Sequence, residues 1–117
     1  MNLGSYVIDR TKEIKWHRKV KQIGERSYHY IVLDITCADG IKSLEFGAYM
    51  IKESMAALYQ MQYDPSATHS RYDIPYNLVK IIAEKHFQNI SNDDKKLISL
   101  CYISLFSMEP GVTLIEQ

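Results

Sequence analysis

The sequence predicts an α+β fold in which an antiparallel sheet of three or four N-terminal strands packs against three C-terminal helices. Two observations carry this prediction: apolar residues alternate with other residues before position 46, and from Ala48 onward they recur with a helical period. Every predicted strand precedes every predicted helix, which is typical of α+β layering. The 117 residues, 46% hydrophobic and 24% charged, match the size and composition of one domain spanning residues 1–117.

The strongest local signal is a β-hairpin over residues 28–46. Its first strand is rich in β-branched and aromatic residues, and alternation places four apolar side chains on one face: Ile31, Leu33, Ile35 and Cys37. Asp39 and Gly40 suit the tight turn that follows, because both residue types tolerate a positive φ. Residues 41–46 then return as the partner strand, with the apolar side chains directed toward the core.

Residues 13–23 fit two structures. As a strand, this segment places its apolar side chains on one face and four basic side chains on the other: Lys15, His17, Lys19 and Lys21. As a helix, it spaces Trp16, Val20 and Ile23 at i, i+4 and i+7, and Gly24 provides a stop. We prefer the strand, because so few apolar positions do not make a packed helix. Residues 6–8 are expected to add a short edge strand.

Three helices are predicted after residue 46, near residues 48–63, 75–90 and 92–108. Asp64-Pro65-Ser66 ends the first, Pro75 is tolerated in the first turn of the second, and Ser91 is a candidate N-cap for the third. From Leu97 to Met108 the third helix is apolar almost all round, which indicates a central buried element. The Pro110-Gly111 pair is expected to end it.

Charge is distributed unevenly along the chain. The formal net charge is zero, but the first 26 residues carry seven basic and three acidic side chains, so this segment is +4 and the remainder −4. Trp16, Tyr28 and Tyr30 lie near these basic residues, and rings beside cations are typical of nucleic-acid surfaces. The sequence pI of about 6.9 argues against a nucleic-acid partner, since dedicated binders are usually strongly basic.

Asp34 is the carboxylate of greatest interest, because it interrupts an apolar strand. Two interpretations are open: it forms a metal-dependent nuclease site with Glu45, or it lies on a partly exposed face paired to a cross-strand lysine or arginine. The second is preferred, since one face of an antiparallel sheet is commonly solvated. His17 and His29 become neighbours if the first hairpin forms, and would then provide an acid–base pair. Two surface histidines are the preferred interpretation.

Cys37 and Cys101 each lie in an apolar stretch, which predicts two buried free thiols. No secretory signal is visible and no apolar run approaches the roughly 20 residues that span a bilayer, so we expect a cytoplasmic protein without a membrane segment. The sequence contains no zinc-site spacing, phosphate loop or nucleophile motif, and we expect no cofactor, metal site or catalytic residue. His86 is expected to be a core or boundary histidine hydrogen-bonded to the backbone.

The loop between the first two helices is the candidate binding surface. Residues 59–76 contain four of the nine tyrosines, and Tyr and Arg dominate binding hot spots. Because helices hold both of its ends, ordering this loop on binding costs less entropy. The predicted partner-binding residues are Tyr63, Asp64, His69, Arg71, Tyr72 and Asp73.

These features favour a small protein that acts by binding a protein partner, and they favour a binding protein over an enzyme. In its most specific form, the hypothesis is a bacterial immunity or antitoxin-type protein that neutralises a toxin enzyme. Acidic residues such as Asp64 and Asp73 would then meet a basic toxin domain. Two alternatives stay open: an RNA- or DNA-processing nuclease, and an accessory nucleic-acid-binding domain.

Overall fold

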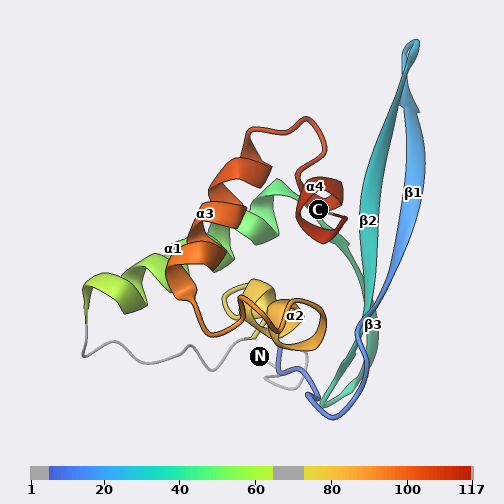
Figure 1. Cartoon of the computed structure of the whole chain (residues 1–117). Helices are drawn as coiled ribbons and strands as arrows, with labels where there is room; N and C mark the ends of the chain where they lie inside the picture. Colours follow the sequence, from blue (N-terminus) through green and yellow to red (C-terminus); the bar gives the residue numbers. More distant parts are fainter. Residues whose placement is uncertain (1–5, 65–72, 117) are drawn as a thin grey trace.

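The computed structural model describes residues 6–64 and 73–116, and in these ranges the strands precede the helices (Figure 1). The elements, in chain order, are β1 (Lys15–Ile23), β2 (Arg26–Cys37), β3 (Gly40–Phe46), α1 (Ala48–Tyr63), α2 (Leu78–His86), α3 (Asp94–Leu105) and α4 (Pro110–Ile115). The α+β prediction is confirmed. α1 has the predicted bounds, whereas α2 and α3 are shorter than predicted and α4 was not expected.

The sheet has the order β1-β2-β3, with both neighbouring pairs antiparallel. Residues 15–23 lie in β1, which confirms the strand interpretation of this ambiguous segment. The turn from β1 to β2 is tight because Gly24 adopts a φ of 63°, a left-handed conformation that glycine reaches without a steric penalty. In the resulting register, Lys15 lies opposite Asp34 and Ile23 lies opposite Arg26.

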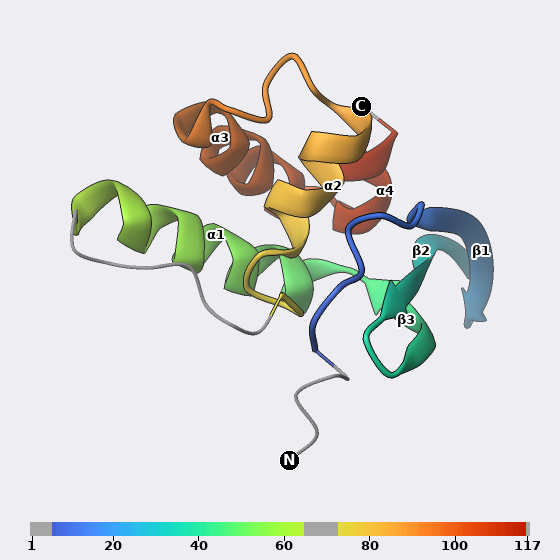
Figure 2. The same cartoon turned by 90° about the horizontal axis from the view of Figure 1, so that it is seen from below.

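One face of β2 lies at the centre of the core. The four apolar side chains predicted for this face are buried, and they share one cluster with residues of α2 and α4: Ile31, Leu33, Ile35 and Cys37 with Leu78, Val79, Ile82 and Leu114. All the helices lie on this side of the sheet (Figures 1 and 2). The other face is therefore left uncovered by the described elements.

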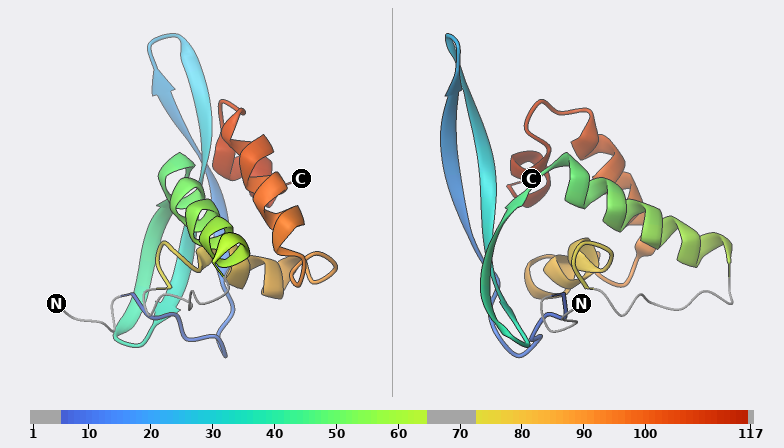
Figure 3. Two further views of the ribbon diagram at one scale, coloured as in Figure 1. Left: turned by 90° about the vertical axis from the view of Figure 1, so that its left-hand side faces the viewer. Right: turned by 180° about the vertical axis from the view of Figure 1, so that it is seen from behind.

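The hairpin of β1 and β2 extends beyond the helices (Figures 1 and 3). All nine residues of β1 are exposed, and the fully buried positions of β2 begin at Ile31. Because β3 ends opposite Ile31, at Phe46, the outer part of the hairpin is a two-stranded ribbon. We call residues 15–30 the β-arm.

Polar contacts hold the base of the β-arm to the segment around α4. The Arg18 Nη1 atom lies 2.8 Å from Glu116 Oε1, and the backbone N–H of His29 donates to Glu109 Oε2 at 2.5 Å. These contacts lie on the face of the arm that points toward the helices. They leave its other face open.

The N-terminal segment joins the sheet through a bridge and not through the predicted edge strand. Ile8 makes an isolated antiparallel bridge with Cys37. The Ala38 N–H donates to Val7 O at 3.0 Å, and the Asp9 N–H donates to Thr36 O at 2.8 Å. This short pairing covers the end of β2 and places Ile8 in the core.

The prediction that α3 is a central buried helix is wrong. Its buried side chains are Leu97, Cys101 and Ser104, whereas Tyr102 and Ile103 are 58% and 64% exposed. The helix lies on the outside of the helical layer, where it packs on α1 and α4 (Figure 3). Part of its apolar surface is therefore left uncovered by the described residues.

Both predicted ends of α3 are also wrong. Asp93 is the N-cap, since its Oδ1 accepts from the Lys96 N–H at 3.1 Å, while Ser91 Oγ donates to Gln88 O. At the other end, Pro110 begins α4 instead of ending α3. A proline fits the first turn of a helix because its missing N–H would have no partner within the helix.

The two cysteines are free and buried, as predicted. Cys37 contributes to the main core cluster beside the sheet, and so does Cys101 from α3. Burial raises the pKa of both thiols, and that of Cys101 reaches about 12. Both thiols are therefore protonated in the folded protein at neutral pH.

We expect the Cys101 thiol to make stability fall with pH in alkaline solution. The unfolded thiol loses its proton near pH 9, while the folded thiol keeps it up to about 12. Over that window the unfolded state binds fewer protons, so the free energy of unfolding falls by up to about 1.4 kcal/mol per pH unit. Urea unfolding between pH 9 and 10.5 should therefore decline less steeply for Cys101→Ala than for the wild type. Equal slopes would contradict this account.

Candidate functional site

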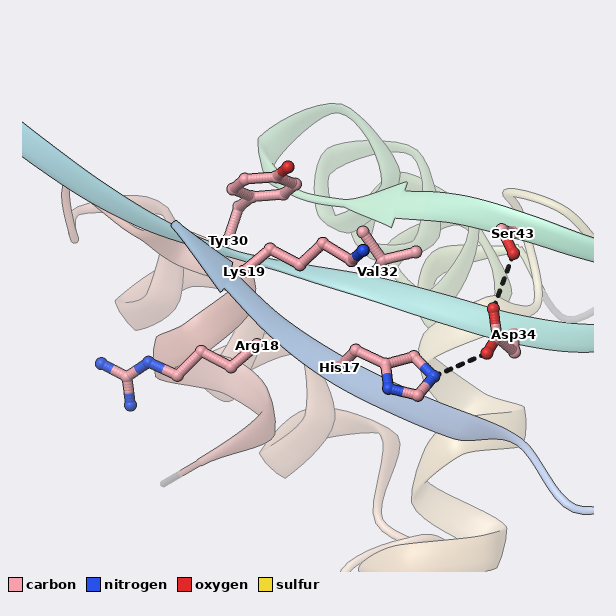
Figure 4. A pocket seen from close by; sticks show the side chains of 7 residues that line it. All are labelled: His17, Arg18, Lys19, Tyr30, Val32, Asp34 and Ser43. Carbon is pink, nitrogen blue, oxygen red and sulfur yellow. Dashed lines mark hydrogen bonds and ion pairs between the residues drawn. The ribbon is translucent and has the colours of Figure 1, made fainter. Parts of the chain in front are cut away.

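Asp34 lies on the uncovered face of the sheet, as preferred from the sequence, but its partners differ from those predicted. The His17 Nε2 atom lies 2.6 Å from Asp34 Oδ2, and the Ser43 hydroxyl donates to Asp34 Oδ1 at 2.7 Å (Figure 4). The hydrogen bonds from Ser43 and then His17 hold the pKa of the Asp34 carboxyl below its ordinary value. The register explains both contacts, because Lys15 and Ser43 lie directly opposite Asp34 and His17 lies diagonally across.

The order of these three side chains decides what they can do chemically. Asp34 is in the middle and accepts from both neighbours; its lowered pKa makes it a weak base for the Ser43 hydroxyl, and the His17 ring is hydrogen-bonded to Asp34 instead of to that hydroxyl. Glu45 does not join the group, since its carboxylate lies 3.6 Å from the Lys21 ammonium. Among residues 6–64 and 73–116 there is no group of three side chains that could hold a metal ion. The geometry of Asp34 is that of a bonded surface carboxylate.

The structure excludes the alternative in which His17 and His29 form an acid–base pair. His17 lies opposite Val32 and His29 lies opposite Val20, so the two histidines point to opposite faces of the ribbon. His29 Nδ1 instead accepts from Arg18 Nε at 3.1 Å. The prediction for His86 is confirmed, because its Nε2 lies 3.3 Å from the Ile14 carbonyl oxygen and its ring packs edge-on against Trp16.

The predicted binding loop is described at its two ends. Tyr63 and Asp64 are exposed where α1 ends, and the Tyr63 ring lies 4.7 Å from that of Tyr59. His69, Arg71 and Tyr72 lie outside the described residues. Their role as partner contacts stays a prediction.

Asp73, predicted as a partner contact, is 6% exposed and bonded within the protein. Its carboxylate accepts from the Ile8 N–H and from the Asn77 side-chain amide, both at 2.9 Å, and from Arg10 Nη2 at 3.2 Å. These bonds join the N-terminal segment to the start of α2. The carboxylate is thus engaged in the fold, and the role of Asp73 as a partner contact stays a prediction.

Sequence reasoning missed a second exposed surface, on α3. Four large apolar side chains at and beyond the end of this helix are between 58% and 76% exposed: Tyr102, Ile103, Phe106 and Met108. We call these four residues the α3 patch. The rings of Tyr102 and Phe106 pack edge-to-face with centroids 5.0 Å apart. The i, i+4 spacing of the two aromatic residues was visible in the sequence, but it was assigned to the core.

The uncovered sheet face continues onto the β-arm as a third surface. Lys19, Tyr30 and Val32 lie beside the Asp34 group and line one shallow hollow with it, and Arg18 points away from it (Figure 4). The cations of β1 and the rings of β2 thus share this face. Besides polar and aromatic side chains, the face carries three aliphatic ones, Ile23, Val32 and Ile41.

Comparison of the chain with protein-family models, curated proteins and solved structures finds no match. None of the described helices is long and apolar enough to cross a membrane. Function is therefore inferred from the exposed surfaces and their chemistry.

Proposed function

We propose that the chain acts by binding a protein partner and that the α3 patch is the centre of the contact surface. The α3 patch carries this proposal, because several large exposed apolar side chains at the end of one helix of a small domain commonly mark a binding surface. Tyr and Phe bury a large area when a partner covers them. The edge-to-face contact between Tyr102 and Phe106 also orders the two rings before binding, which lowers the entropic cost.

In its most specific form, the proposal is that the partner is a toxin enzyme and that the chain is a bacterial immunity or antitoxin-type protein. The charge distribution supports this form. Residues 15–30 carry five basic and one acidic side chain, a net charge of +4, so the rest of the neutral chain carries −4. Residues 48–117 carry six basic and eight acidic side chains, a net charge of −2, and this mildly acidic helical part suits a basic enzyme whose natural ligand is nucleic acid.

A double variant, Ile103→Ala with Phe106→Ala, is expected to lose the partner. Both side chains are mostly exposed, so their removal should leave the thermal unfolding of the chain nearly unchanged. Truncating two hot-spot residues should weaken binding by at least about thirtyfold. The measurement is capture from native cells on immobilised wild type and variant, followed by titration of the purified partner.

The matched control is Lys95→Ala with Lys96→Ala, which changes two exposed residues at the other end of α3. This variant should bind the partner within about twofold of the wild type. Equal partner binding by the wild type and the α3-patch variant would overturn the proposal. So would loss of self-association in that variant, because the patch would then be a contact between two copies of the chain. If the captured protein is an enzyme that the chain fails to inhibit, the toxin form is wrong.

A further inference from the structure

We propose that the uncovered face of the β-arm binds single-stranded nucleic acid. Of the α3 patch, Met108 lines a hollow with Lys21, Tyr28 and Tyr30 of the β-arm, but the binding partner proposed here belongs to a different chemical class. The neutral net charge argued against such a partner, but the charges are unevenly distributed. The basic excess lies in residues 15–30, which the fold places in one hairpin. Residues 15–30 carry a net charge of +4, and Lys19, Lys21 and Arg26 lie on the two-stranded ribbon that extends beyond the helices (Figure 1).

The cations of β1 are regularly spaced along the β-arm. The side chains of Lys15, His17, Lys19 and Lys21 occupy alternate positions of β1 and share one face. Alternate residues of a strand are about 6.8 Å apart, so these side chains form an evenly spaced row along the arm. Such a row of cations can contact successive phosphates of an extended nucleic-acid backbone. A compact anion would not require a row of cations.

A row of tyrosine rings lies beside the cations. Tyr30 lies directly opposite Lys19 and Tyr28 directly opposite Lys21, on the neighbouring strand and the same face. Both tyrosines are partly exposed. The Lys21 ammonium lies 5.2 Å from the centroid of the Tyr30 ring, so charge and ring already share one surface. Bases can stack on such rings only when they are unpaired, which favours a single strand over a duplex.

The acidic groups on this face leave the row of cations positive. Asp34 is at the base of the arm and is hydrogen-bonded to His17 and Ser43. Glu45 lies 3.6 Å from Lys21, so it competes with a phosphate for that one cation. No ion pair of Lys15 or Lys19 is found among the described residues.

The test is fluorescence anisotropy of the full chain with a labelled 20-nucleotide oligo(dT), titrated at several salt concentrations. A triple variant with Lys15, Lys19 and Lys21 each changed to Gln should bind at least about tenfold more weakly in low salt. Its log–log salt slope should be shallower by about 2, since each lost phosphate contact on a single strand removes about 0.7. Tyr28→Ala should weaken binding roughly fivefold or more through lost stacking.

Two controls make this test specific. A triple variant with Lys52, Lys95 and Lys96 changed to Gln removes the same charge from exposed helical positions and should retain wild-type affinity. Glu45→Gln frees Lys21 and should bind about two- to fivefold more tightly. Equal losses in the two triple variants would overturn the proposal, as would tighter binding to a matched duplex or to anionic vesicles. An absence of oligo(dT) binding by the wild type in low salt would overturn it outright.

Discussion

Gly111→Ala is expected to lower the free energy of unfolding by about 3 kcal/mol, at the upper end of the usual cost of overpacking. A Cβ atom at this position would lie 1.9 Å from the Phe46 carbonyl oxygen and 3.1 Å from its carbonyl carbon. Both are backbone atoms at the junction of β3 and α1, so no side-chain rotation relieves the clash. α4 would have to move away from the sheet, and urea unfolding measures the loss.

The control for this change is Gly47→Ala, one residue beyond Phe46. A Cβ atom there has no neighbour within 4 Å, and φ is −137°, an extended value that any residue adopts. We expect its free energy of unfolding to change by less than about 1 kcal/mol, since Gly47 is an N-cap residue. Similar losses in both variants would show that the close approach of α4 to Phe46 is not what makes Gly111 necessary.

Asp73→Ala is expected to lower the free energy of unfolding by about 2–3 kcal/mol, because it leaves the buried Ile8 N–H without its acceptor. The Asn77 amide and Arg10 lose the same carboxylate. Asp73→Asn keeps one acceptor oxygen and should lose about half as much. The measurement is urea unfolding of the isolated chain, so that no partner contributes to the result.

Glu84→Ala, at an exposed position on α2, is the matched control and should stay within about 0.5 kcal/mol of the wild type. A stable Asp73→Ala variant would contradict the structural role derived from the hydrogen bonds.

Residue alternation was enough to predict the sheet, because the strand period directly determines which side chains face the core. Ile31, Leu33 and Ile35 alternate strictly, and the structure buries all three. The same logic fails for α3. An apolar pattern on every side of a helix is compatible with two structures: a central buried helix, or an outer helix with an exposed binding surface. The sequence does not distinguish them.

The candidate site was harder to predict, because it depends on contacts between distant positions. The register of the β1–β2 hairpin brings His17 within hydrogen-bond distance of Asp34. The Asp73 carboxylate accepts a hydrogen bond from the backbone N–H of Ile8, which is 65 positions away in the sequence. From their local sequence, His17 and Asp73 looked like surface positions. The β-arm could not be predicted either, since its exposure depends on where the helices stop covering the sheet. Its charges and rings were visible, but their arrangement in two adjacent rows was not.

The central claim is that two surfaces bind two kinds of partner, and a crossed binding measurement tests it most directly. The affinities of the isolated protein partner and of oligo(dT) are measured for the wild type, the Ile103→Ala/Phe106→Ala variant and the Lys15/Lys19/Lys21→Gln variant. We predict that the α3-patch variant loses the protein and keeps oligo(dT), and that the β-arm variant does the reverse. If both variants lose both ligands, or if neither variant loses either, the assignment of the two surfaces is wrong.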